Sequence, residues 1–186
     1  MATDQHTRLS WLIAADGERM RLLGRVQALH LPDCWIGAGF VRSAVWDHLH
    51  DRVATRPGDD VDVIWFDRER ASRAVDRDIE AQLKAVDPAI DWSVKNQARM
   101  HRRNNDEPYR STEDAVSRWP ETATAVALRL TVGGIDIMAP FGLDDLFSLV
   151  VRPTPAFAGE KRPVFQRRVQ EKRWLERWPR LVLSPG

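Results

Sequence analysis

The chain has 186 residues, of which 43% are hydrophobic and 30% charged, and this balance predicts one compact domain with a substantial core rather than two full domains. Its 28 basic and 27 acidic residues give a net charge of +1, so the overall charge favours neither nucleic acid nor a membrane as a partner. The single cysteine, Cys34, excludes an internal disulfide and a cysteine-based zinc cluster.

The sequence shows no feature of a membrane or secreted protein. No apolar run approaches the length of a transmembrane helix, and the polar start at residues 1–10 lacks the profile of a signal peptide. We therefore expect a cytoplasmic protein with a single domain over residues 1–186.

The first half of the chain predicts a helical segment followed by alternating strands and helices. Apolar residues recur at helical spacing over about residues 8–31, and a break near Asp16-Gly17 indicates a helix pair or one kinked helix. The further elements expected are a strand at 34–36, a glycine turn at 37–39, a helix at 40–49, a loop at 51–58, a strand at 61–66, a helix at 74–86 and a strand at 90–95.

The second half is less regular. Residues 99–110 are basic without a clear period, and helix starts are predicted at Ser111 and Pro120. Gly133-Gly134 predicts a hairpin that joins strands at 128–132 and 135–138. A short helix at 143–150 and a charged C-terminal helix at 163–178 complete the chain.

The candidate site begins with acids on strands. Asp60 and Asp62 are separated by one apolar residue, so both point to one face with Cα atoms about 6.6 Å apart. Asp136, flanked by isoleucines on a later strand, would complete an oxygen-only site of the kind that magnesium prefers. The alternative is that Asp60 caps a loop and Asp62 faces solvent on an edge strand.

The glycine turn supplies a second candidate feature. Gly37 and Gly39 would expose backbone amides at a helix start, where phosphate binds, and Arg42 would add a charged contact. Glycines at this position also serve simple helix–sheet packing, and Arg42 is equally compatible with a solvated or salt-bridged role. Lys95 and Asn96 follow a strand and are candidates for nucleotide contacts or for ordinary surface positions.

The C-terminal helix carries many basic residues together with Trp174 and Trp178, one helical turn apart. This pattern is compatible with RNA binding through phosphate contacts and stacking. It is equally typical of a helix that docks its tryptophans on the core and exposes its charged face, and we favour this second interpretation.

The glycine turn, the acid-apolar-acid strand and the later third acid together resemble the nucleotidyltransferase superfamily, which is DNA polymerase beta-like. The turn is similar to that of tRNA nucleotidyltransferases and poly(A) polymerases. Longer blocks look like a bacterial nucleotidyltransferase-like family without a defined substrate, and this resemblance runs from about residue 35 to 178. The blocks are residues 38–42, 60–64, 95–101, 119–125 and 139–147.

The resemblance implies an α/β (α+β) fold, in which a small mixed sheet is flanked by helices and the core spans about residues 32–150. It implies that Asp60, Asp62 and Asp136 are the catalytic and metal-binding carboxylates. It implies that the triphosphate is bound by Gly37, Gly39 and Arg42. The predicted nucleotide-binding residues also include Lys95 and Asn96. Gly39 stands where many members have serine, and the loop before Asp60 is long.

The implied reaction transfers a nucleoside monophosphate from a nucleoside triphosphate, such as ATP, to an acceptor hydroxyl and releases pyrophosphate. Two Mg²⁺ ions, which Mn²⁺ can replace, would align the reacting groups. The acceptor, whether small molecule, RNA or protein, and the oligomeric state are not specified by the sequence. The alternatives are a non-catalytic nucleotide-binding or regulatory module and an RNA-binding protein that uses the C-terminal helix.

Overall fold

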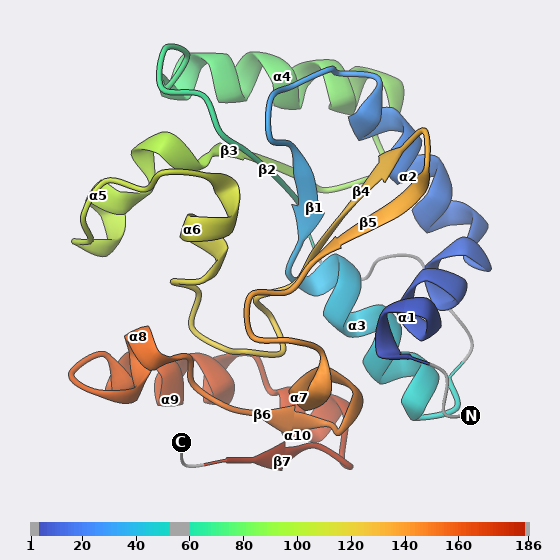
Figure 1. Ribbon diagram of the computed structural model, residues 1–186, viewed down its shortest axis with the longest axis vertical. Coiled ribbons are helices and arrows are strands. Elements are labelled where there is room, and N and C mark those ends of the chain that lie inside the picture. The colour runs from blue at the N-terminus through green and yellow to red at the C-terminus, as the bar shows by residue number, and fades with distance from the viewer. Residues whose placement is uncertain (1–3, 53–59, 185–186) are drawn as a thin grey trace.

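The computed structural model describes residues 4–52 and 60–184, and a five-stranded mixed sheet lies at its centre (Figure 1). The strand order is β3-β2-β1-β4-β5, so the first strand of the chain lies in the middle. β2 and β3 are parallel, whereas the other neighbouring pairs are antiparallel. The strands are β1 Trp35–Gly37, β2 Val61–Trp65, β3 Trp92–Asn96, β4 Ala127–Thr131 and β5 Gly134–Met138. The expected mixed sheet and the β4–β5 hairpin are confirmed.

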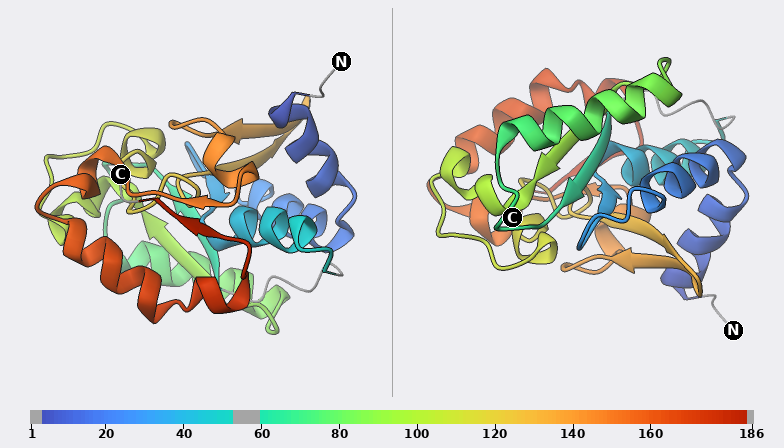
Figure 2. Two further views of the ribbon diagram at one scale, coloured as in Figure 1. Left: turned by 90° about the horizontal axis from the view of Figure 1, so that it is seen from below. Right: turned by 90° about the horizontal axis from the view of Figure 1, so that it is seen from above.

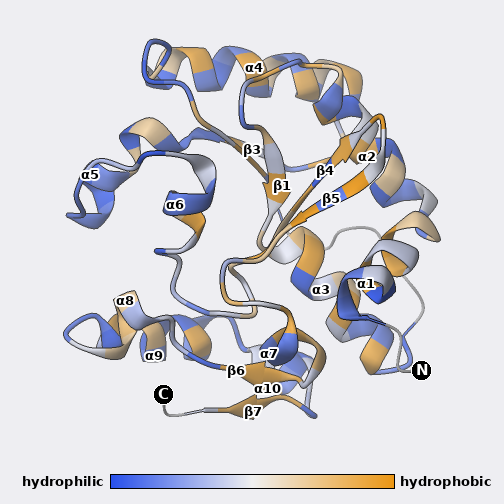
Figure 3. Cartoon of the chain, viewed as in Figure 1, coloured by the Kyte–Doolittle hydropathy of each residue, from blue (hydrophilic) through white to orange (hydrophobic). Residues whose placement is uncertain are grey.

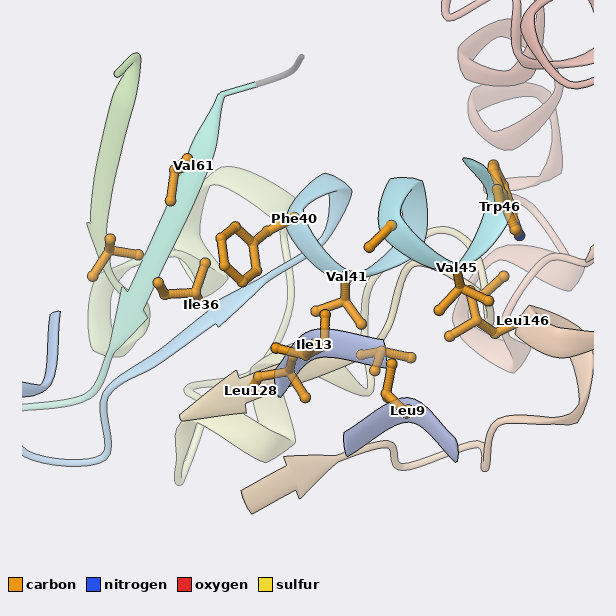
Figure 4. Packing of buried hydrophobic residues seen from close by; sticks show 14 of the residues in the cluster. Leu9, Ile13, Ile36, Phe40, Val41, Val45, Trp46, Val61, Leu128 and Leu146 are labelled. Carbon is orange, nitrogen blue, oxygen red and sulfur yellow. The ribbon is translucent and has the colours of Figure 1, made fainter. Parts of the chain in front are cut away.

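Three helices pack on one face of the sheet and form the main core with it, and Figure 4 shows the part of this core formed by the first and third of them. They are α1 Gln5–Ala14, α2 Gly17–Gln27 and α3 Gly39–Leu49. The register pairs Ile36 with both Val63 and Leu128, so these three fully buried side chains face the helices together. Asp16 ends the first helical run, because its carboxylate accepts the Arg19 amide at 3.0 Å and caps α2. The predicted break at this point is confirmed.

The other face of the sheet carries a smaller core and, beside it, Asp62. Trp35, Ile64 and Met138 pack there against Val116 of α6 Thr112–Val116. Ser111 caps α6, as predicted, with its hydroxyl accepting the Asp114 amide at 3.1 Å. The sheet thus separates a large apolar layer from a face that is only partly covered.

Helix α4, Arg73–Val86, covers the edge strand β3. The amide of Val94 donates to Glu80 at 3.2 Å, and the amide of Asn96 donates to Asp76 at 3.0 Å. Side chains of α4 therefore satisfy backbone donors that an open edge would expose. Beyond β3 the chain forms the short helices η1 Gln97–Arg99 and α5 His101–Asn104, within a segment for which the sequence showed no period.

The C-terminal part packs against α3 and lies at the opposite end of the molecule from α4 (Figures 1 and 2). Trp46 of α3 contacts Trp174 and Trp178 edge to face, with ring centres 5.8 and 5.1 Å apart. Both C-terminal tryptophans are buried, so the interpretation of a docked helix is confirmed. The elements are α7 Asp144–Phe147, β6 Val150–Val151, α8 Pro155–Ala158, α9 Arg162–Glu171, α10 Trp174–Arg177 and β7 Val182–Leu183.

Three predicted helices differ from the structure. The C-terminal helix is broken between α9 and α10, because Arg173 adopts a left-handed conformation with φ 50°. The helix expected over 143–150 is reduced to α7, because Leu149, with φ 59°, turns the chain into β6. No helix starts at Pro120, since Glu121 is buried and forms an isolated β-bridge with Pro153.

None of the helices in the described ranges is long and apolar enough to cross a membrane. Most of the loop predicted over 51–58 lies outside the described residues.

Candidate active site

Asp60 and Asp62 lie at the start of β2, beside the glycine turn that ends β1. The register pairs Asp62 with Gly37, so the turn and this carboxylate are direct neighbours across an antiparallel pair. Asp60 is exposed just before the strand and shares a face with Asp62, because strand side chains alternate. Since β2 lies between β1 and β3, the alternative of Asp62 on an edge strand is wrong.

The glycine turn has a strained backbone at Ala38 and no room for a side chain at Gly37. Ala38 adopts φ 55° and ψ −124°, a conformation that favours glycine and costs another residue about 1–3 kcal/mol. A Cβ added at Gly37 would lie 2.9 Å from Cη2 of Trp119. α3 begins at Gly39, where the amides of Gly39 and Phe40 have no intrahelical acceptor. The turn therefore has the form of an anion-binding helix start.

Asp62 is a partly satisfied carboxylate. Its Oδ1 accepts the Ser93 hydroxyl at 2.9 Å and lies 3.6 Å from Nζ of Lys95, which also donates to Ser93. Burial raises the pKa of Asp62, and the charge of Asp60 adds to the rise, whereas Lys95 and Ser93 oppose it. The structure thus brings Lys95 from β3 to the two acids, and a cation beside them would offset the cost of keeping both charged.

Asp62, Lys95 and Ala38 line a cleft of about 570 Å³, a size typical of small-molecule sites. Residues of the sheet, the turn, α5, the loop before β4 and α9 line it, and Figure 1 shows α9 below the sheet. Further cations reach the cleft from four positions, namely Arg103, Arg118, Arg167 and Arg168. A cleft in which Asp62 lies near several guanidinium groups, with Asp60 on the same face of β2, suits a phosphate-bearing ligand together with a cation.

The carboxylates of the site would not complete the coordination of a magnesium ion by themselves. They fit the ion if the phosphates of a bound nucleotide supply further ligands. The described residues contain no cluster of three or more His, Cys, Asp or Glu side chains that could hold a metal. Magnesium is commonly bound through one or two carboxylates, with substrate phosphates and water completing its coordination. Asp60 and Asp62 on one face meet that requirement.

Asp136 does not join the pair. It lies on β5, and strands β1 and β4 separate β5 from β2. Three strand spacings place it about 14 Å from the strand of Asp62, too far to share one metal ion. Its carboxylate instead accepts from Arg129 at 2.9 Å, and the Arg129 guanidinium lies 4.1 Å from the ring centre of Trp35. The predicted three-carboxylate site is therefore corrected to two carboxylates.

Asn96 is a structural residue rather than a nucleotide ligand. Its side-chain oxygen accepts the amides of Asp67 and Ala98, and its nitrogen donates to the carbonyls of Asp67 and Arg70. These four bonds use the full hydrogen-bonding capacity of the side chain, which is completely buried. Asn96 fastens the loop after β2 to the end of β3.

Arg42 also has a structural position. Its guanidinium is buried, lies 4.4 Å from the ring centre of Trp174 and donates to the Thr124 hydroxyl at 3.2 Å. Nearby Glu121 is buried and accepts from Arg168 of α9 at 2.9 Å. The charge of Glu121 also interacts with Arg42, so Arg42, Glu121 and Arg168, which we term the ionic junction, connect α3 to α9. Trp174 and Thr124 thus hold the Arg42 guanidinium inside the protein, contrary to the phosphate contact predicted for it.

Two neighbours of the acids were not predicted from the sequence. Ser93 faces Asp62 because the parallel register pairs the two residues, and Trp119 covers Gly37 from a loop before β4. Because strand side chains alternate, Ser93 and Lys95 lie on one face of β3, and this alternation could have predicted Ser93 as a site residue. Trp119 had no local signal, since its contact spans a long stretch of sequence.

Comparisons with known proteins show the family and the fold of the chain. A family model described as nucleotidyltransferase matches residues 24–183. A solved structure described as a CCA-adding enzyme head domain is 33% identical, with a TM-score of 0.82, over 93% of this chain and 94% of that one. No curated protein matches the chain.

Full CCA-adding enzymes share the fold at lower identity. The enzyme in complex with ATP is 18% identical, with a TM-score of 0.54, over 95% of this chain and 42% of that one. The Bacillus stearothermophilus enzyme in complex with CTP is 19% identical, with a TM-score of 0.58, over 91% of this chain and 41% of that one. The chain thus spans less than half the length of these enzymes.

Proposed function

The chain belongs to the nucleotidyltransferase family, and from that premise we propose that its cleft transfers a nucleoside monophosphate from a nucleoside triphosphate to an acceptor hydroxyl. The acceptor oxygen bonds to the α-phosphorus, the bond from that phosphorus to the bridging oxygen breaks, pyrophosphate leaves, and the hydroxyl proton passes to solvent. The observation that carries the proposal is the register that places Asp62 directly beside Gly37.

The protein would act by positioning and charge. The start of α3, at Gly39, would hold phosphate oxygens, and Lys95 and Arg167 would neutralise further negative charge in the cleft. Asp60 and Asp62 would hold the divalent cation. When bound, Mg²⁺ would neutralise charge on the phosphates and lower the pKa of the acceptor hydroxyl.

The test is calorimetric titration with ATP and CTP, the nucleotides in the related complexes, with and without magnesium. We expect magnesium-dependent binding that is lost in Asp60→Asn/Asp62→Asn and retained in Asp78→Asn. Asp78 is an exposed acid of α4 outside the cleft, so its variant controls for the loss of a negative charge. Wild-type protein that binds neither these nor the other two ribonucleoside triphosphates would contradict the proposal.

A second candidate is nucleotide binding without transfer. Lys95 supports it, because its ammonium lies 3.6 Å from Asp62 and already supplies part of the positive charge that the acids require. The two functions differ in turnover: transfer consumes α-labelled triphosphate and releases pyrophosphate when a cellular RNA or metabolite fraction is added. Transfer by wild type and none by Asp62→Asn would exclude the binding-only function.

A further inference from the structure

A second, larger depression lies around the edge of the sheet from the Asp62 cleft. It has a volume of about 860 Å³ and is bounded by α4, the end of β3 and α5 (Figure 1). Hydrophilic residues dominate α5 where it borders this depression (Figure 3). We term the depression the basic groove, because six cations line it: Arg73, Arg77, Lys95, Arg99, Arg102 and Arg103.

The positive charge of the basic groove is largely uncompensated. Its two acids are already occupied: Asp76 accepts from Trp65, Asn96 and Arg99, and Glu80 accepts the Val94 amide. Four of its cations are exposed, and their guanidinium groups have no ion pair or hydrogen bond with the rest of the described chain; they are Arg73, Arg77, Arg102 and Arg103. Such a concentration of unpaired arginines, in a chain with a net charge of +1, predicts an anionic ligand.

The basic groove leads into the candidate active site. Lys95, Met100 and Arg103 line both the groove and the cleft. Lys95 is also the residue that contacts Asp62. A chain of negative groups lying along α4 would therefore pass Lys95 and reach the two acids.

The lining identifies the class of ligand. Among the described residues, no aromatic side chain lines the basic groove, so this lining offers no surface on which bases could stack. Guanidinium groups match phosphate oxygens in pairs, and Arg73 and Arg77 stand one helical turn apart on α4. A cationic acceptor would be repelled. The groove therefore suits a phosphodiester backbone bound through its charge rather than its bases.

We propose that the basic groove binds the phosphate backbone of a nucleic acid, whose terminal hydroxyl reaches Asp62 and serves as the acceptor. The acceptor role rests on the proposed function, whereas backbone binding by the groove does not. The groove thus supplies an acceptor site within this chain.

The test is fluorescence anisotropy with a short 5′-labelled single-stranded RNA of mixed sequence, measured over a range of salt concentrations. Arg73→Gln/Arg77→Gln should bind about tenfold more weakly, as expected for the loss of two exposed charge contacts. Its slope of log affinity against log salt should fall by about 0.7 for each lost phosphate contact. The matched control is Arg8→Gln/Lys84→Gln, which removes the same charge at exposed positions outside both depressions.

The outcomes separate this proposal from the proposed function. Arg73→Gln/Arg77→Gln should retain wild-type affinity for nucleoside triphosphate, because neither residue lines the Asp62 cleft. RNA binding that persists when no triphosphate binds would reject the transfer function and keep the groove. Equal RNA affinity of wild type and groove variant, an equal loss in the control, or displacement of RNA by polyglutamate of matched charge would each overturn the groove.

Discussion

Asp62 in the cleft is partly buried and Glu121 in the ionic junction is fully buried. The neighbours that offset the cost of burying each carboxylate differ. Burial raises the pKa of Glu121, and Arg168 and Arg42 oppose the rise from two other segments. Burial also raises the pKa of Asp62, but Asp60 adds to the rise, and only Ser93 and Lys95 oppose it. Compensation by distant arginines indicates a structural acid, whereas an acid beside a second acid in a cleft is a candidate for function.

The largest expected effect concerns stability. Glu121→Ala leaves Arg168 and Arg42 without their shared carboxylate, and we expect it to lower the free energy of unfolding by about 2–3 kcal/mol. The value lies at the low end for a buried pair, because a third of the Arg168 side chain is exposed and can regain water. Urea unfolding measures the loss.

Asp62→Ala provides the contrast in the same urea experiment. It removes a carboxylate whose charged form the fold disfavours, so its free energy of unfolding at neutral pH should stay within about 0.5 kcal/mol of wild type or rise above it. Loss of more stability in Asp62→Ala than in Glu121→Ala would reverse the comparison of the two regions.

Gly37→Ala should have the next largest effect. The added Cβ would lie 2.9 Å from Trp119, so the indole must move, at a cost of about 1–3 kcal/mol. Replacing Trp119 by leucine should recover part of the loss in a double-mutant cycle followed by thermal unfolding. Gly24→Ala in α2 is the control, because a Cβ there meets nothing within 4 Å. Independent effects of Gly37→Ala and Trp119→Leu would show that no such contact exists.

The smallest expected effect is on proton binding. Lys95 lowers the pKa of Asp62, so Lys95→Met should raise that pKa further above its ordinary value, as measured by NMR titration of the carboxyl carbon. A raised folded-state pKa means that the folded protein holds the proton more tightly than the unfolded chain. The tighter binding of this proton therefore stabilises the folded protein fully at pH values below the pKa of Asp62 in the unfolded chain. The stabilisation is lost as the pH rises through the pKa of Asp62 in the folded protein. An unchanged or lowered pKa in Lys95→Met would place Lys95 away from Asp62.

Local signals were sufficient for much of the fold. The capping residues Asp16 and Ser111, the Gly133-Gly134 turn and the acid-bearing strand β2 all lie where short-range chemistry placed them. The glycine turn and Asp62 come together as expected, because β1 and β2 pair directly.

The sequence does not reveal the order of the strands in the sheet. Most of the wrong predictions for site residues follow from this missing long-range information. Asp136 has the local pattern of a site acid, but β1 and β4 separate its strand from β2. Asn96 was misassigned because its partners come from the loop after β2. Arg42 was misassigned because Trp174 and Thr124 cover it from late in the chain. Each error involves a long-range contact that no local pattern encodes.

In the proposed nucleotide complex, the two acids beside the glycine turn hold the cation without Asp136. The most direct test of this arrangement is paramagnetic broadening by Mn²⁺ in amide NMR spectra recorded with a bound nucleoside triphosphate. We expect the signals of Gly37, Asp62 and Ser93 to disappear first, while that of Asp136 persists. Broadening centred on Asp136 and Arg129, with Gly37 and Ser93 unaffected, would contradict the account.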